Sequence, residues 1–154
     1  KAKAVSENPA DVCEFVFALH RAEKFDRGFR SSPTAIAYHV PCHLKPQNIG
    51  IRARDLMKLL PECKIRVVSE CCGHDGTWAM KAEHYDDSIK TGRRAFEGLQ
   101  GREAEVWATD CPLAAIQIEQ HAGRGALHPL QIIARAYRED GFSQQVDEQA
   151  NGDE

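Results

Sequence analysis

Four of the six cysteines in this sequence of 154 residues stand where a chain is expected to turn. Cys42 and Cys111 adjoin proline, and the neighbouring pair Cys71 and Cys72 precedes a glycine. Thiolates are good ligands for zinc and for the irons of iron–sulfur clusters. The three positions are separated by 28 and 38 residues, whereas the cysteines of a local zinc finger lie about two to four residues apart. A shared metal site therefore needs three distant segments to meet.

The adjacent cysteines, Cys71 and Cys72, limit the kinds of metal centre that the chain could bind. Neighbouring side chains on an extended backbone diverge, so Cys71 and Cys72 reach two irons of a cluster more easily than they both hold one ion. Gly73 and Gly76 would let the backbone pass close to an inorganic body. These residues favour an iron–sulfur cluster, with zinc as the alternative. Unliganded core cysteines are a plainer interpretation, and a strained Cys71–Cys72 disulfide in a thiol oxidoreductase is a weaker hypothesis.

Two cysteines and three histidines remain to be placed. Cys13 lies at the edge of an apolar helical stripe and Cys63 lies in a turn, so both are interpreted as structural. His43 and His74 adjoin the cysteine loops, where a histidine can donate a hydrogen bond to sulfur or replace a ligand. The alternative is that they are polar loop residues. His128 precedes a proline at the end of a further candidate strand, where it could complete the site or simply bond the backbone.

Two aspartates also flank the cysteines. Asp75 lies in the sequence GHDG, and Asp110 directly precedes Cys111. We expect both to be turn and cap residues rather than acid–base catalysts, because the sequence pairs neither with a second carboxylate. GHDG also lacks the spacing of a dinucleotide-binding loop and the lysine of a phosphate-binding loop. Nucleotide binding is therefore not expected.

Short runs of apolar and β-branched residues predict a strand before each cysteine loop. The runs cover residues 34–40, 64–70 and 104–110, with a very short fourth candidate at 126–129. Helical patterns separate them, and strands that alternate with helices pair in parallel, so that all strands end at one edge of the sheet. The predicted fold is a small α/β domain of three to four parallel strands flanked by helices, with the cysteines at the carboxyl edge.

The helices are predicted from apolar spacing and from end signals. Proline is favoured at the first position of a helix and disfavoured inside one. The predicted helices are a first one capped by Asn8 and begun by Pro9, with Val12, Phe15, Val16 and Leu19 on its buried face; a second from Ile49 to Leu60; a long third from Trp78 to Leu99; and two begun by Pro112 and Pro129.

Composition limits the partners and the location. A net charge of −3 with 28% charged residues leaves no basic excess for nucleic acid. No apolar run reaches the roughly 20 residues of a membrane-spanning helix, so membrane contact is expected only through a complex. Cysteine usage and the absence of an export signal at the first residue predict a cytoplasmic protein, or a peripheral one on the inner face of the membrane. Residues 1–139 are predicted to form one domain and 140–154 an acidic disordered tail.

Four segments carry a resemblance to a known family. In order and spacing they resemble the cysteine-rich CCG domain of heterodisulfide reductase-like proteins, and within that family the iron–sulfur subunits of anaerobic glycerol-3-phosphate dehydrogenases. The resemblance covers residues 8–138 and implies the second of two such domains in a longer protein with a ferredoxin-like segment. The segments are YHVPCHLKPQNIG, CCGHDGTWAMK, TDCPLAAIQIEQ and HPLQIIARAY.

The resemblance implies an iron–sulfur cluster, of the 4Fe-4S type, held by Cys42, Cys71, Cys72 and Cys111. The domain would be the electron-transfer part of an oxidoreductase, without catalytic residues of its own, and would relay electrons from a flavin-containing dehydrogenase subunit to a quinone or similar acceptor. Members with a double non-cubane cluster have a further cysteine where this sequence has Ala114, which argues against that cluster and against disulfide reduction. A structural zinc domain that docks subunits is the alternative.

Overall fold

A computed structural model describes residues 10–101 and 103–142. Three parallel strands form one sheet in the order β2-β1-β3, so β1 is central and pairs with both neighbours. This confirms the predicted small parallel α/β fold. The strands are β1 (Ala35–His39), β2 (Lys64–Val68) and β3 (Val106–Thr109).

The fourth candidate strand is reduced to one isolated bridge. Leu127 pairs with Ala108 of β3, and the chain leaves the sheet directly afterwards. Proline has no backbone N–H for a ladder and is favoured at the start of a helix, and Pro129 is the first residue of α7. The expected strand at 126–129 was therefore too long, because the helix begins within it.

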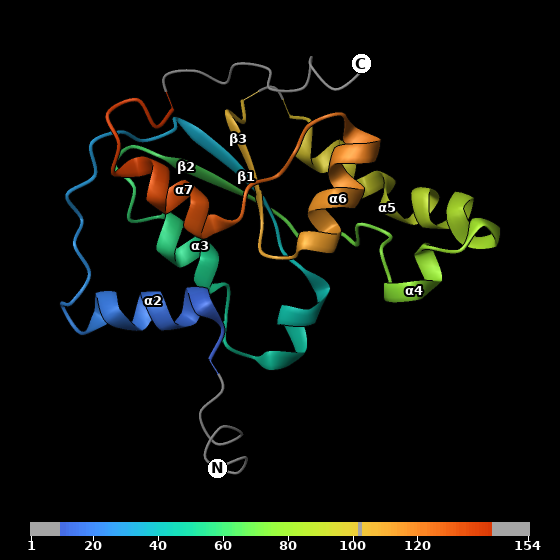
Figure 1. The fold of residues 1–154 in the computed structure, drawn as a ribbon, viewed down its shortest axis with the longest axis horizontal. Coiled ribbons are helices and arrows are strands. Elements are labelled where there is room, and N and C mark those ends of the chain that lie inside the picture. The colour runs from blue at the N-terminus through green and yellow to red at the C-terminus, as the bar shows by residue number, and fades with distance from the viewer. Residues whose placement is uncertain (1–9, 102, 143–154) are drawn as a thin grey trace, which may run out of the picture.

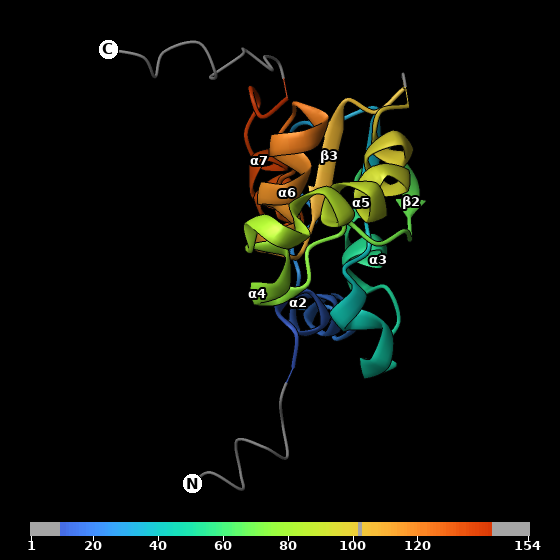
Figure 2. The same cartoon turned by 90° about the vertical axis from the view of Figure 1, so that its right-hand side faces the viewer.

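Helices cover both faces of the sheet (Figures 1 and 2). Successive side chains of a strand point to opposite faces, and β1 follows this rule: Ile36 and Tyr38 enter one buried apolar cluster, while Ala37 enters the other. The first cluster includes side chains of α2 (Val12–Arg21), α3 (Arg52–Met57) and α7 (Pro129–Ala136), and the second includes side chains of α5 (Tyr85–Leu99) and α6 (Pro112–Ala122).

The first described helix begins later than predicted. Its N-cap is Asp11, whose carboxylate accepts the backbone N–H of Cys13 at 2.8 Å and that of Glu14 at 3.3 Å. Asn8 and Pro9, the predicted start, lie outside the described residues. Aspartate is as good an N-cap as asparagine, and the two hydrogen bonds to its carboxylate explain why α2 begins after Asp11.

The buried face of this helix is also displaced from the prediction. Cys13 is fully buried, and Val16 and Phe17 pack against the same apolar cluster. Val12 and Phe15, predicted to be buried, are 46% and 56% exposed. Apolar residues occur on more than one side of this helix, so spacing alone could not select the face that meets the sheet.

One predicted helix is shorter than expected, and another is broken into pieces. The segment around 49–60 is helical only in α3, after the 3-10 turn η1 (Cys42–Gln47). The long helix expected from Trp78 consists of α4 (Gly76–Ala79), η2 (Ala82–His84) and α5. Lys81 is extended between them, which brings the ring of Trp78 onto that of His84 with centroids 4.8 Å apart. This stacking can form because the helix breaks.

At the carboxyl end of the described chain, Phe142 packs against the first apolar cluster. Most of the predicted acidic tail, residues 143–154, lies outside the described residues. Within the described part of the chain, no helix has the length and apolar character needed to cross a bilayer.

We predict that two isoleucines of α6 differ sharply in their contribution to stability. Ile118 is fully buried and Ile116 is 51% exposed. Ile118→Ala should lower the free energy of unfolding by about 2–5 kcal/mol, because a cavity replaces packed methylenes. Ile116→Ala, with the same change in size and helix propensity, should cost less than about 1 kcal/mol. Urea unfolding measures both, and equal losses would contradict the assigned packing of α6.

Candidate metal centre

All four predicted ligand cysteines line one cavity at the carboxyl edge of the sheet. Cys42 begins η1 after β1, Cys71 and Cys72 follow β2, and Cys111 is the N-cap residue of α6 after β3. The cavity has a volume of about 170 Å³. Three histidines also line it, His39, His43 and His74, so soft ligands and ring nitrogens surround one small space.

The four thiols differ in exposure and interact electrostatically with one another. Cys72 is buried, Cys111 is half-buried, and Cys42 and Cys71 are exposed. Burial raises the pKa of the Cys72 thiol, and the neighbouring thiols add to that increase, while the backbone N–H of His74 opposes it. Four thiolates at close range repel one another, so a bound metal would stabilise their charged forms.

His39 links two of the cysteine loops by hydrogen bonds. It was not among the site residues predicted from the sequence. Its side chain is buried, with Nε2 3.0 Å from the carbonyl oxygen of Glu70 and Nδ1 3.2 Å from the hydroxyl oxygen of Thr109. A carbonyl only accepts, so Nε2 donates to Glu70 and Nδ1 accepts from Thr109. Burial lowers the pKa of His39, which agrees with this neutral form. The ring therefore ties the residue before Cys71 to β3.

The only sequence signal for His39 was a histidine in an otherwise apolar strand. A buried polar side chain in such a strand needs hydrogen-bond partners, and this could have marked it. The partners themselves lie 31 and 70 residues away in sequence. No local pattern could have named them.

The Cys-Cys-Gly turn packs directly on α5. Gly73 has a φ of +81°, and a Cβ added there would lie 2.0 Å from the carbonyl oxygen of Ser88. The Ser88 hydroxyl donates to the carbonyl of Gly73 at 2.9 Å, and the Gln117 amide donates to that hydroxyl at 2.9 Å. A Cβ on Gly92 would lie 2.4 Å from the carbonyl oxygen of Cys72. Two glycines and a buried hydrogen-bonded chain thus fix the turn that carries both cysteines.

The remaining candidates divide between the cavity and other places. His43 and His74 line the cavity. His128 does not line it but caps α7, with Nδ1 accepting the N–H of Leu130 at 3.2 Å. The structure thus agrees with the simpler interpretation of His128, in which its side chain bonds the backbone. Cys13 and Cys63 are also absent from the lining, as expected of structural cysteines.

The expectation that the two aspartates act in a turn and as a cap was only partly right. Asp75 precedes α4 and is exposed, without a side-chain cap bond. Asp110 has buried carboxylate oxygens, and a carboxylate oxygen of Asp11 lies within 4.8 Å of one of them. Burial raises the pKa of Asp110. The view that no second carboxylate lies near Asp110 is therefore wrong, because the start of α2 packs against the end of β3.

Comparison with known proteins places this arrangement in a family. The profile of the cysteine-rich domain family CCG matches residues 36–119, which contain all four cavity cysteines. The chain belongs to the CCG family. This confirms the resemblance seen in the sequence, since the match runs from β1 into α6.

Two curated relatives are similar to this CCG chain over a longer stretch. They are the C subunits of anaerobic glycerol-3-phosphate dehydrogenase from Escherichia coli strain K12 and from Escherichia coli O157:H7. Each is 30% identical over 118 residues, which cover 73% of this chain and 30% of the relative. The chain thus spans about 30% of the length of these relatives. No solved structure shows a significant match.

We predict that Gly73→Ala disrupts the cysteine turn far more than Gly123→Ala disrupts its own. Both glycines have positive φ, +81° and +74°, but an added Cβ clashes with Ser88 at the first and meets open space at the second. Gly123→Ala should cost about 1–2 kcal/mol, the backbone penalty alone. Gly73→Ala should cost clearly more and impair metal retention. Unfolding curves and metal content test this, and indistinguishable variants would contradict the packed turn.

We predict that His39 and Thr109 contribute to stability as a pair. His39→Leu should cost about 2–4 kcal/mol in the free energy of unfolding, because two polar groups lose their buried partner. Thr109→Val, which keeps the shape, should be less costly once His39 is already leucine. A double-mutant cycle by urea unfolding measures the coupling. Thr109→Ser, which keeps the hydroxyl, is the matched control, and strictly additive effects would rule out the bridge.

Proposed function

We propose that this CCG domain binds an iron–sulfur cluster through Cys42, Cys71, Cys72 and Cys111 and serves as an electron-transfer part of an oxidoreductase. The observation that carries the proposal is that four thiols from three separate loops line one cavity. Family membership and similarity to a dehydrogenase subunit support the same role.

The size of the cavity fits a cluster better than a single ion. One water needs roughly 10–15 Å³ of such volume, and the cavity offers about 170 Å³. A lone zinc ion coordinated by four cysteines leaves little free space, because its ligands close around it. The adjacent cysteines and the close backbone approach at Gly73 also suit a larger inorganic body.

The surrounding residues would hold and tune the bound group. An iron–sulfur cluster supplies reversible one-electron transfer when bound. The N–H of Gly73 lies 3.4 Å from Cys71 Sγ, and the N–H of His74 bonds Cys72. Hydrogen bonds to ligand sulfurs raise a cluster's reduction potential. Neutral His39 keeps two of the loops in place without adding charge.

Exposure suggests how electrons would enter and leave. Cys42 and Cys71 are exposed, whereas Cys72 is buried. A partner could therefore approach the cavity from the side of the first two thiols. By analogy with the dehydrogenase subunits, we propose a flavin-containing subunit as electron donor, a quinone or similar acceptor, a ferredoxin-like segment as relay, and membrane contact on the cytoplasmic side through the complex.

We predict that cysteine substitutions divide into two classes. Cys42→Ser, Cys72→Ser and Cys111→Ser should each lose most bound iron and sulfide, because a serine hydroxyl is a poor ligand for iron. Cys63→Ser should retain both, since Cys63 is not part of the cavity lining. Anaerobically purified protein should be brown, and iron and sulfide analysis with visible absorbance measures the loss.

Two results would count against the iron–sulfur proposal. Anaerobic wild-type protein that contains zinc but no iron or sulfide, and that loses this zinc in Cys42→Ser, Cys72→Ser and Cys111→Ser, would establish the alternative, a structural zinc domain that docks subunits. Loss of iron from Cys63→Ser, with retention in the three cavity variants, would show that the wrong cysteines have been assigned as ligands.

A further inference from the structure

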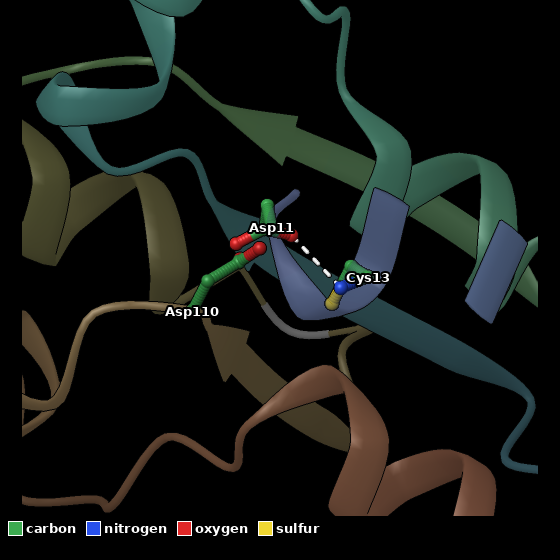
Figure 3. A group of neighbouring side chains, drawn as sticks. All are labelled: Asp11, Cys13 and Asp110. Atoms are coloured by element: carbon green, nitrogen blue, oxygen red, sulfur yellow. Dashed lines mark hydrogen bonds between the residues drawn. The ribbon is translucent and has the colours of Figure 1, made fainter. Parts of the chain in front are cut away.

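A second group of metal-ligand side chains lies where α2 meets the end of β3. Asp11, Cys13 and Asp110 each present a carboxylate oxygen or sulfur, and these atoms all lie within 4.8 Å of one another. Figure 3 shows the two carboxylates together with the Cys13 side chain beside them. None of the three lines the cysteine cavity. The group is therefore separate from the proposed cluster site.

Polar atoms around this group are buried without partners. The side chain of Tyr38 is fully buried, and its hydroxyl oxygen has no hydrogen-bond partner among the described residues. Both carboxylate oxygens of Asp110 are also buried without a hydrogen-bond partner among the described residues. Burial raises the pKa of Tyr38, and the Asp110 carboxylate raises it further as a close polar neighbour. The Tyr38 hydroxyl therefore lies beside Asp110, although the pair does not have the geometry of a hydrogen bond. Such unpartnered buried groups are costly and point to a missing ligand.

In the described part of the chain, no lysine or arginine balances the charge of this group. Within residues 10–101 and 103–142, neither Asp11 nor Asp110 forms an ion pair with lysine or arginine. The basic side chain that acts on Asp110 is His128, and its Nδ1 accepts the N–H of Leu130 at 3.2 Å. A bound cation would stabilise the two carboxylates and a deprotonated thiol together.

We propose that Asp11, Cys13 and Asp110 bind one divalent cation of the zinc class. A thiolate with two carboxylates suits zinc, whereas calcium and magnesium prefer oxygen ligands alone. With metal–ligand bonds of about 2.0–2.3 Å, tetrahedral ligand atoms lie roughly 3–4 Å apart, so side-chain shifts of about 1 Å close the site. Binding displaces the proton of the Cys13 thiol to solvent.

Each side chain has a distinct role in this site. Asp11 uses Oδ1 to cap α2 and keeps its other oxygen for the ion. Cys13, fully buried, supplies the soft ligand. Asp110 would bind from the loop after β3, and with the ion in place the neighbouring Tyr38 hydroxyl would donate to its second oxygen as an outer partner. The ion would join α2 to the residue directly before Cys111, which makes Cys13 a ligand rather than only a packing residue.

The test uses cobalt, whose bond to a thiolate gives a near-ultraviolet charge-transfer band. The background is the full chain with Cys42, Cys71, Cys72 and Cys111 all changed to serine, which leaves Cys13 and Cys63 as its remaining thiols. We expect one equivalent of Co²⁺ to bind with this band, and Zn²⁺ to displace it. Asp11→Asn, Asp110→Asn and Cys13→Ser should each weaken binding by about 100-fold or more, whereas Cys63→Ser should bind normally.

Asp11→Asn separates binding from folding, because asparagine caps a helix as well as aspartate but lacks the negative charge. If the background variant does not fold, the same substitutions are made in the anaerobic wild-type chain and zinc is measured beside iron. One zinc per chain should then disappear from the three ligand variants while iron remains. Zinc or cobalt binding that is unchanged in Asp11→Asn and Asp110→Asn, or the absence of any thiolate band in the background, overturns the proposal. Because iron is measured separately, failure of this site leaves the cluster proposal unaffected, and the reverse also holds.

Discussion

Parallel pairing of three strands is the constraint on which the rest of this structure depends. Because β1 lies between β2 and β3 with both pairs parallel, the chain leaves all three strands at one edge. Each cysteine loop starts within a few residues of such an exit. Antiparallel pairing of either neighbour would send one loop to the opposite edge and divide the thiols. The metal-binding capacity of the domain is in this sense a consequence of sheet topology.

Parallel strands alone would bring the loops near one another but would not fix their shapes. Two sets of buried hydrogen bonds do this. His39 bridges the backbone before Cys71 to Thr109, and Ser88 with Gln117 holds the carbonyl of Gly73 on the α5 side. The cysteine loops after β1, β2 and β3 are therefore held by buried hydrogen bonds as well as by the strands that precede them. Preorganisation of this kind lowers the cost of binding.

The two proposed metal sites share one loop. Asp110 and Cys111 are neighbours after β3, yet Asp110 turns toward α2 while Cys111 lines the cavity. Side chains of adjacent residues on an extended chain point in opposite directions, so one short loop can serve both faces of the sheet edge. An ion bound by Asp11, Cys13 and Asp110 would tie α2 to the loop that carries Cys111. The stability of α2 and the geometry around Cys111 would then be coupled.

Local sequence signals were enough to predict the fold class, the three strands and the cysteines that meet at their ends. These features rest on local signals: apolar runs, helix-starting prolines and turn glycines act within a few residues of themselves. The α/β alternation then allows few topologies, so the convergence of Cys42, Cys71, Cys72 and Cys111 could be anticipated from the order of the residues alone. Family membership followed from the same segments.

Long-range packing was needed to establish which face of α2 is buried, where the helix near Trp78 breaks, and what His39 and Asp110 contact. The residues that contact these features come from distant segments of the chain. From the local sequence alone, several apolar or polar residues were equally good candidates for each contact. Side-chain packing chooses among them, because burial of one face and satisfaction of each buried polar atom are properties of the assembled core. The group formed by Asp11, Cys13 and Asp110 is of this kind: Cys13 was expected to be a packing residue and Asp110 a cap, and the contact between α2 and the end of β3 brings both beside Asp11.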